Sequence, residues 1–498
     1  MSNRNQVRAT VFPTSFSWGA ASSAFQIEGG ATADLRGPSI WDTFCRRAGA
    51  IHGGHHADVA CDHFHRFTDD VELMQRMGLR AYRFSIAWPR VLPTGRGAVH
   101  EAGLAFYERL VDALLAAGIE PWATLYHWEL PDALQQRGGW QNREIAEWFA
   151  EYAGVVTARL SDRVNRWITL NEPQIFIGLG LGQGIHAPGL KLSVREQLAA
   201  AHHALLAHGQ AVQRMRAVMK RPGQIGWAPA VRVNYPATES AADIDAARRA
   251  TLAVLKPDMW NTAWFADPIH LGRYPDDGLR CFGADAPRVH RGDMDVIQQP
   301  VDFLGVNIYS GTRTANDTSG EAVTVDHPIG CPRSALNWPV APESLRWGPR
   351  FLWERYGSPI VVTENGMSNL DWVDLDGRVR DPQRIDYTRR YLLELERAIT
   401  DGTDVRGYFH WSLLDNFEWA EGYKDRFGLV YVDYATQQRV LKDSAHWYRR
   451  VIETNGASLR ESGDVPVMGA NPVGGETAGE DRPSGSQRLS LAKAANRG

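Results

Sequence analysis

Short and nearly uninterrupted apolar runs alternate with longer amphipathic segments along most of this sequence. Such runs are typical of parallel strands buried on both faces, and the longer segments carry apolar residues at helical spacing. Strands that alternate with helices predict a parallel sheet, and eight strands favour a single closed (β/α)₈ TIM barrel of the α/β class. The eight predicted strands are 16–20, 81–86, 120–126, 166–170, 224–228, 302–308, 360–363 and 406–410.

Six helices are predicted between these strands. Glycine follows three of them, at Gly78, Gly118 and Gly357, as is common where a helix ends. The predicted helices are 65–77, 103–117, 142–160, 194–219, 342–356 and 381–400.

The composition of the chain changes close to residue 452. The last 50 residues contain no Phe, Trp or Tyr, and 469–485 are rich in Gly, Pro, Glu and Thr. A segment of this composition cannot bury enough apolar surface to offset the entropy of ordering. We therefore expect one barrel domain over 1–452, with elaborated loops after its strands, and a disordered tail over 453–498.

Charge and hydropathy exclude two classes of protein. The 54 Lys and Arg nearly balance the 58 Asp and Glu, which argues against a nucleic-acid partner. No apolar stretch is long enough to cross a membrane, and the polar start carries no apolar signal region. The sequence predicts a cytoplasmic protein without a membrane partner, and it leaves oligomerisation open.

Two glutamates follow buried strands directly and are candidate catalytic groups. Glu172 comes after the fourth predicted strand and Glu364 after the seventh, and each stands beside an asparagine. A salt bridge or a helix start would explain one such carboxylate. Two of them at the end of a barrel where chemistry takes place favour function. Paired carboxylates are the requirement of glycoside hydrolysis, in which one protonates the leaving oxygen and the other attacks or assists water.

A long, ordered series of motifs supports this interpretation. The chain resembles the β-glucosidases of glycoside hydrolase family 1 from about residue 13 to residue 450. The motifs that carry the resemblance are at 16–20, 26–29, 37–42 and 82–88, then His127-Trp128, Asn171-Glu172-Pro173, 363–366 and 411–419.

The resemblance implies a role for each matched residue. Glu172 is the general acid/base and Glu364 the nucleophile of a reaction that retains the anomeric configuration. Arg83, Tyr309 and Asn307 support the nucleophile. The residues implied in substrate binding are Gln26, His127, Trp128, Asn171, Glu418 and Trp419 at the glycone, Trp411 as the platform under its ring, and Trp338 beside the aglycone.

The implied substrate is a small β-glucoside or cello-oligosaccharide that loses its terminal non-reducing β-D-glucosyl residue. Relatives that act on phosphorylated sugars carry Ser and Lys or Tyr where this chain has Glu418-Trp419-Ala420-Glu421, so we expect an unphosphorylated glycone. No metal and no other cofactor is expected. Three points stay open: glucose, fucose and galactose share such a pocket, transglycosylation shares the glycosyl-enzyme, and a sugar-binding protein without turnover has the same barrel.

Overall fold

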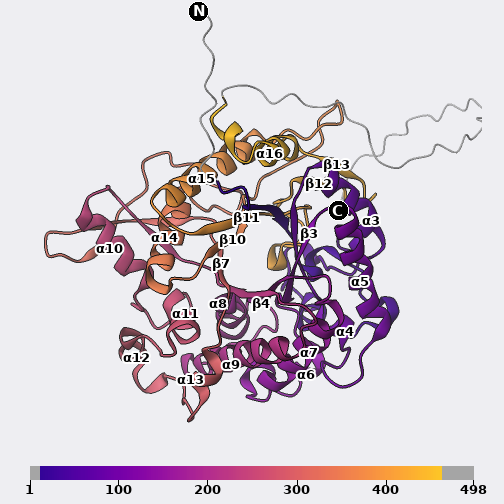
Figure 1. Cartoon of the computed structure of the whole chain (residues 1–498), viewed down its shortest axis with the longest axis horizontal. Coiled ribbons are helices and arrows are strands. Elements are labelled where there is room, and N and C mark those ends of the chain that lie inside the picture. Colours follow the sequence, from indigo (N-terminus) through magenta and orange to yellow (C-terminus); the bar gives the residue numbers. More distant parts are fainter. Residues whose placement is uncertain (1–11, 462–498) are drawn as a thin grey trace, which may run out of the picture.

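We describe a computed structural model of the chain, which covers residues 12–461. Eight parallel strands close into a barrel in the order β1-β11-β10-β7-β5-β4-β3-β2, with helices around it (Figure 1). The predicted fold class is confirmed, because all eight predicted apolar runs form these strands. The strands are β1 (Ser17–Ala21), β2 (Ala81–Ser85), β3 (Glu120–Tyr126), β4 (Arg166–Asn171), β5 (Gln224–Ala228), β7 (Phe303–Asn307), β10 (Ile360–Asn365) and β11 (Val405–Trp411).

The six predicted helices are also present, with ends that differ by at most three residues. The Ser193 side chain accepts from the Glu196 backbone N–H, and the Glu196 carboxylate accepts from Ser193 N–H, which fixes the start of α9. Gly357 ends α14 in the left-handed conformation, with φ 64°. These helices are α3 (His63–Arg76), α5 (Glu101–Ala116), α7 (Ile145–Leu160), α9 (Val194–Val218), α14 (Ser344–Tyr356) and α15 (Pro382–Thr400).

The loops that follow the strands are elaborated, as expected, but their elements were not predicted. A three-stranded sheet has the order β6-β8-β9, and β12 pairs with β13. The added strands are β6 (Val233–Pro236), β8 (Gly311–Asn316), β9 (Ala322–Thr324), β12 (Val430–Val432) and β13 (Arg439–Leu441). The added helices are α1 (Ala24–Ile27), α2 (Ile40–Cys45), α4 (Trp88–Val91), α6 (Asp132–Gln135), α8 (Pro173–Ile175), α10 (Ala241–Leu252), α11 (Thr262–Leu271), α12 (Asp276–Phe282), α13 (Asp293–Ile297), α16 (Asp443–Glu453) and the π-helix Phe176–Gln183.

Aromatic side chains fill the inside of the barrel. The Trp122 ring lies 5.4 Å from that of Phe303 and 4.9 Å from that of Phe409. Glycine at 19 and 226 makes room for this layer, since a Cβ there would lie 2.6 Å from the Phe409 ring and 2.5 Å from the Phe303 ring. The layer closes the barrel interior and leaves the carboxyl ends of the strands to form a site.

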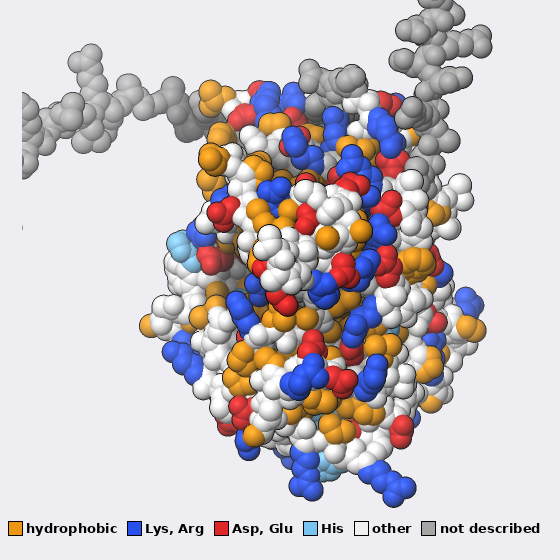
Figure 2. Space-filling model, turned by 90° about the vertical axis from the view of Figure 1, so that its left-hand side faces the viewer, with side chains coloured by type: hydrophobic (Ala, Val, Ile, Leu, Met, Phe, Trp, Pro, Cys, Tyr) orange, Lys and Arg blue, Asp and Glu red, His pale blue; other side chains and the backbone are white. Residues whose placement is uncertain are grey.

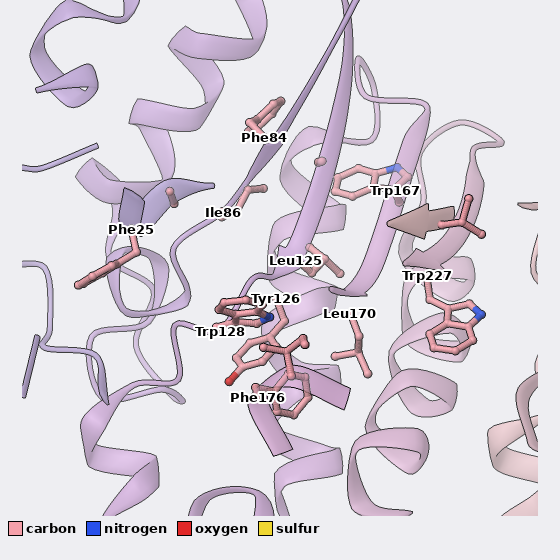
Figure 3. Close-up of a cluster of buried hydrophobic side chains, with 14 of the residues drawn as sticks. Phe25, Phe84, Ile86, Leu125, Tyr126, Trp128, Trp167, Leu170, Phe176 and Trp227 are labelled. Carbon is pink, nitrogen blue, oxygen red and sulfur yellow. The ribbon is translucent and has the colours of Figure 1, made fainter. Parts of the chain in front are cut away.

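A second apolar layer joins the outside of the strands to the surrounding elements. Figure 3 shows Phe84, Leu125, Trp167 and Trp227 projecting from the strands into this layer. Because side chains alternate across a strand, the residues next to these four along each strand face the barrel interior. Arg83, the neighbour of Phe84, is therefore directed inward with 1% of its surface exposed.

The packed domain continues beyond the predicted boundary at 452. Leu459 is 2% exposed, the Arg460 guanidinium bonds to Glu396, and the Trp18 indole donates to Asn455 at 2.9 Å. The boundary was placed too early because aromatic content was used as its marker, whereas a leucine and polar contacts complete the packing. Of the expected disordered tail over 453–498, residues 462–498 lie outside the described residues.

The described part of the chain, 12–461, has no helix with the length and apolar character that a membrane crossing requires. On the side of the molecule in Figure 2, Lys and Arg side chains are interspersed with Asp and Glu. The absence of a nucleic-acid partner stays a prediction.

Candidate active site

A cavity of about 790 Å³ brings the two candidate catalytic carboxylates together. Glu172 directly follows β4, and Glu364 lies in β10. Both are at the end of the barrel where strands pass into loops, as barrel chemistry requires. The predicted residues that line the cavity are His127, Trp128, Glu172, Asn307, Tyr309, Trp338, Glu364, Trp411, Glu418 and Trp419.

Both oxygens of Glu364 accept short hydrogen bonds. Arg83 Nη1 donates to Oε1 at 2.7 Å, and Tyr309 Oη donates to Oε2 at 2.6 Å. Arg83 is itself fixed, because its remaining nitrogens donate to Thr124 Oγ1 at 3.1 Å and to Asn171 Oδ1 at 2.7 Å. Charge-assisted bonds of this kind stabilise the ionised carboxylate and set its orientation.

Asn307 lies between the two carboxylates and not on Glu364 alone. Its amide donates to Glu172 Oε1 and to Asn171 Oδ1, both at 3.0 Å, and its oxygen accepts from Thr363 Oγ1 at 2.6 Å. Its hydrogen bonding also acts to lower the pKa of Glu364, so the expected support of the nucleophile stays a prediction beside the direct contact with Glu172. From the sequence, Asn307 was assigned with its neighbour Tyr309, and only the tertiary structure separates their partners.

The two carboxyls have different electrostatic surroundings. Burial and the nearby charge of Glu364 raise the pKa of Glu172 well above its ordinary value. Burial also raises the pKa of Glu364, but Arg83 and the Tyr309 hydroxyl act against this rise. The shared proton therefore resides on Glu172 and the negative charge on Glu364, which is the assignment an acid and a nucleophile require.

His127 has one buried ring nitrogen without a hydrogen-bond partner among the described residues. Asn171 Nδ2 donates to His127 Nε2 at 3.1 Å, so the ring proton belongs on Nδ1. That buried Nδ1 has no partner among the described residues. Burial, with the charge of Arg83, lowers the pKa of His127 well below its ordinary value, so the ring is neutral. A neutral Nδ1–H donor suits a sugar hydroxyl.

Gln26 and Asn171 are buried and are not among the residues that line the cavity, so their sugar contacts stay a prediction. Gln26 Nε2 donates to Asn416 Oδ1 and to Phe417 O, both at 2.9 Å, and to Glu418 Oε2 at 3.4 Å. It therefore positions the segment that carries Glu418. Asn171 similarly connects Arg83, Asn307 and His127.

A buried lysine fixes the other side of the same segment. Lys442 Nζ donates to Asp371 Oδ2 at 2.5 Å and to Asp415 Oδ1 at 2.6 Å. Arg426 donates to the second oxygen of Asp415 at 2.7 Å. These charges link the loop after β10 to the segment between Trp411 and the cavity residue Phe427.

Indole rings form one wall of the cavity. The rings of Trp128 and Trp419 are 4.5 Å apart, and those of His127 and Trp411 are 5.7 Å apart and nearly parallel. Trp338 lies at the mouth, 5.4 Å from the Tyr309 ring and 39% exposed. Flat apolar faces of this kind suit the faces of a sugar ring.

The sequence interpretation missed most of the cavity mouth. These residues come from loops and short helices between the barrel strands and belong to none of the motifs, so no pattern indicated them. The missed residues are Ile175, Ile185, His186, Ala230, Val231, Arg232, Trp260, Ser310, Leu336 and Phe427. In residues 12–461 no three His, Cys, Asp or Glu side chains are arranged to hold a metal ion.

A family model described as Glycosyl hydrolase family 1 matches residues 8–457. This chain belongs to glycosyl hydrolase family 1. The resemblance expected from the motifs is thereby confirmed.

Curated relatives agree with this family assignment over nearly their whole length. Beta-glucosidase A of Thermotoga maritima is 44% identical over 446 residues, which are 89% of this chain and 98% of the relative. The bifunctional beta-D-glucosidase/beta-D-fucosidase of Bifidobacterium breve is 43% identical and aligns over 90% and 99%. The solved structure of the Thermotoga maritima beta-glucosidase in complex with glucoimidazole has a TM-score of 0.82 at 44% identity, covering 89% of this chain and 99% of that one.

Proposed function

We propose that this chain is a retaining β-glucosidase that removes terminal non-reducing β-D-glucosyl residues through a covalent glycosyl-enzyme. The observation that carries the proposal is the unequal pair of carboxylates in one cavity. Glu364 is held as an anion by Arg83 and Tyr309, whereas Glu172 has its pKa raised well above the ordinary value. The names of the curated relatives support the same activity.

The two carboxylates divide the chemistry of two displacements. Glu364 attacks the anomeric carbon while protonated Glu172 donates its proton to the leaving oxygen. Glu172, now an anion, then takes a proton from water as the water attacks the same carbon. Asn307 orients Glu172 throughout, and Arg83 and Tyr309 orient Glu364.

The remaining predicted residues recognise the glycone. The His127 ring bonds to a hydroxyl, Trp411 lies under the sugar ring, and Glu418 bonds to the far hydroxyls. Burial and the nearby acids Asp425 and Glu364 raise the pKa of Glu418 to about 8. Because Glu418 is then largely protonated at neutral pH, exclusion of a 6-phosphate depends chiefly on the missing cation and on the bulk of Trp419.

One alternative function and two questions of substrate specificity accompany this proposal. A sugar-binding protein without turnover needs neither carboxylate in this arrangement, and both are present and held. Cleavage of cello-oligosaccharides is supported by the relative named 1,4-beta-D-glucan glucohydrolase from Thermotoga neapolitana, which is 44% identical. Hydrolysis of β-fucosyl and β-galactosyl residues is the alternative at the glycone position.

A rate panel over the 4-nitrophenyl β-glycosides of glucose, fucose and galactose, with the glucoside 6-phosphate, tests the proposal. We expect high kcat/KM for the glucoside, and loss of nearly all activity in Glu364→Gln. Glu354→Gln is the matched control, since Glu354 lies on α14 outside the cavity. Absence of glucoside hydrolysis in the wild type, or full activity of Glu364→Gln, would contradict the proposal.

A further inference from the structure

The cavity has a polar floor and an apolar mouth. Catalytic and glycone groups occupy the floor, whereas the lining farther out is largely apolar and includes Leu179, Ile185, Val231, Trp260, Leu336 and Phe427. A sugar in the leaving position requires partners for several hydroxyls, and this part of the lining offers few, since its polar side chains are His186, Arg232, Ser310 and Glu421. A flat aromatic ring requires none.

One cation interrupts this apolar wall. Arg232 is the only Lys or Arg among the described residues that line the cavity. It lies between β5 and β6, with Val231 7% exposed and Val233 1% exposed on either side. Val231 N–H donates to Asn307 O at 3.0 Å, so the backbone at Arg232 is tied to the floor of the site.

The Arg232 side chain is exposed, and within residues 12–461 no hydrogen bond, ion pair or ring contact joins its guanidinium to another residue. The Glu421 carboxylate, which also lines the cavity, is paired, since Lys424 Nζ lies 2.8 Å from Glu421 Oε2. An arginine left free in a cavity wall has five N–H donors that match a carboxylate.

The acids of the cavity do not prevent an anion from binding at the mouth. Glu421 is paired with Lys424, and Glu364 with Arg83. Burial raises the pKa of Glu172 and of Glu418, which favours the uncharged form of both carboxyls. The unpaired charge that an approaching aglycone meets is therefore positive.

We propose that Arg232 selects aglycones in which an aromatic ring carries a carboxylate, so that the preferred leaving groups are phenolic acids. The ring packs against the apolar mouth and the carboxylate pairs with the guanidinium. This inference rests on the proposed β-glucosidase activity and specifies the aglycone of that same site.

The test compares charged and neutral aglycones of nearly equal shape. The β-glucosides of 3-hydroxybenzoate, 4-hydroxybenzoate and 4-hydroxycinnamate are each measured beside the glucoside of the corresponding methyl ester. The ratio of kcat/KM for acid over ester is determined for wild type, Arg232→Gln and Arg291→Gln. Comparing one ratio between variants cancels differences in leaving-group reactivity. Arg291 is an exposed arginine outside the cavity, so its substitution removes the same charge elsewhere.

We expect Arg232→Gln to lower the ratio about five-fold for at least one acid, mainly through KM, which is the upper range for a partly solvated ion pair. Arg232→Lys retains part of the preference, and added salt lowers the wild-type ratio. Arg291→Gln leaves the ratio at the wild-type value.

Two negative results are distinguishable. If the wild type hydrolyses both members of every pair but Arg232→Gln leaves all three ratios unchanged, Arg232 is a solvated surface cation and the aglycone inference is wrong. If the wild type hydrolyses none of these glucosides, nor 4-nitrophenyl β-glucoside, the proposed activity itself is wrong and the inference fails with it.

Discussion

The hydroxyl of Tyr309 provides a direct test of how the site keeps Glu364 ionised. Tyr309→Phe removes the 2.6 Å hydrogen bond to Glu364 Oε2 and keeps the ring that contacts Trp338 and Phe427. A hydrogen bond to a charged acceptor contributes about 1.5–3 kcal/mol, and one pKa unit corresponds to about 1.36 kcal/mol. The pKa of Glu364 should therefore rise by about 1–2 units.

The sign of the pH effect follows from which form the hydroxyl stabilises. It donates to the anion, so its removal favours the protonated carboxyl, which cannot attack. The acidic limb of the kcat/KM profile should move to higher pH by about 1–2 units, and kcat/KM should fall by about 10- to 100-fold below the new limb. The profile is measured with 4-nitrophenyl β-glucoside.

Tyr356→Phe is the matched control. Its hydroxyl donates to the buried Asp267 Oδ1 at 2.7 Å, outside the cavity. We expect this variant to lower the melting temperature and to leave the pH profile in place. If the acidic limb of Tyr309→Phe moves by less than about 0.3 units and kcat/KM stays within about two-fold of wild type, the reasoning on Glu364 is refuted.

Three other predictions concern selectivity and stability. The wild type should prefer β-glucoside to its 6-phosphate by a large factor, and Glu418→Ser should weaken glucoside hydrolysis without creating phosphate activity; equal kcat/KM on the two substrates contradicts this. Lys442→Met should cost about 3–5 kcal/mol of unfolding free energy, because two buried aspartates lose the cation they share and the cluster keeps an uncompensated negative charge, whereas the exposed Lys256→Met should cost little; equal denaturation midpoints contradict this. A chain that ends after residue 461 should keep its melting temperature and activity, whereas one that ends after residue 452 loses the buried Leu459 and should melt lower; equal melting temperatures for the two show that 453–461 add no stability.

The barrel was predictable because a parallel strand buried on both faces has a local signature. The run 120–126 is apolar apart from Glu120 and Thr124, and β3 has the predicted bounds. The predicted strand 360–363 is two residues shorter than β10, because Glu364 and Asn365 are polar and the prediction relied on apolar residues. The polar residues at the strand ends belong to the site, so the apolar pattern does not mark where these strands end. The strands of the added loops are short and partly exposed, and they give no comparable signal.

The catalytic and glycone residues of the candidate site were predictable, whereas most of the cavity mouth and several contacts were not. Motifs placed Glu172 and Glu364 at strand ends, and the closed barrel brings both to one cavity. They did not indicate that Asn307 donates to Glu172, nor that Glu129, next to Trp128, pairs with Arg36 from 93 residues earlier at 3.1 Å. Such partners depend on how loops from different strands meet. Arg232 belongs to no motif, so only the folded cavity identified it.

The anomer formed in chemical rescue by azide tests the division of roles between the two carboxylates most directly. In Glu364→Gly, azide enters the vacated space and attacks the anomeric carbon of 2,4-dinitrophenyl β-glucoside in one displacement, so NMR should show α-glucosyl azide. In Glu172→Gly, the glycosyl-enzyme still forms with this activated substrate and azide attacks from the opposite face, so the product should be β-glucosyl azide. The same anomer from both variants, or the two anomers exchanged, would contradict Glu364 as the nucleophile and Glu172 as the acid/base.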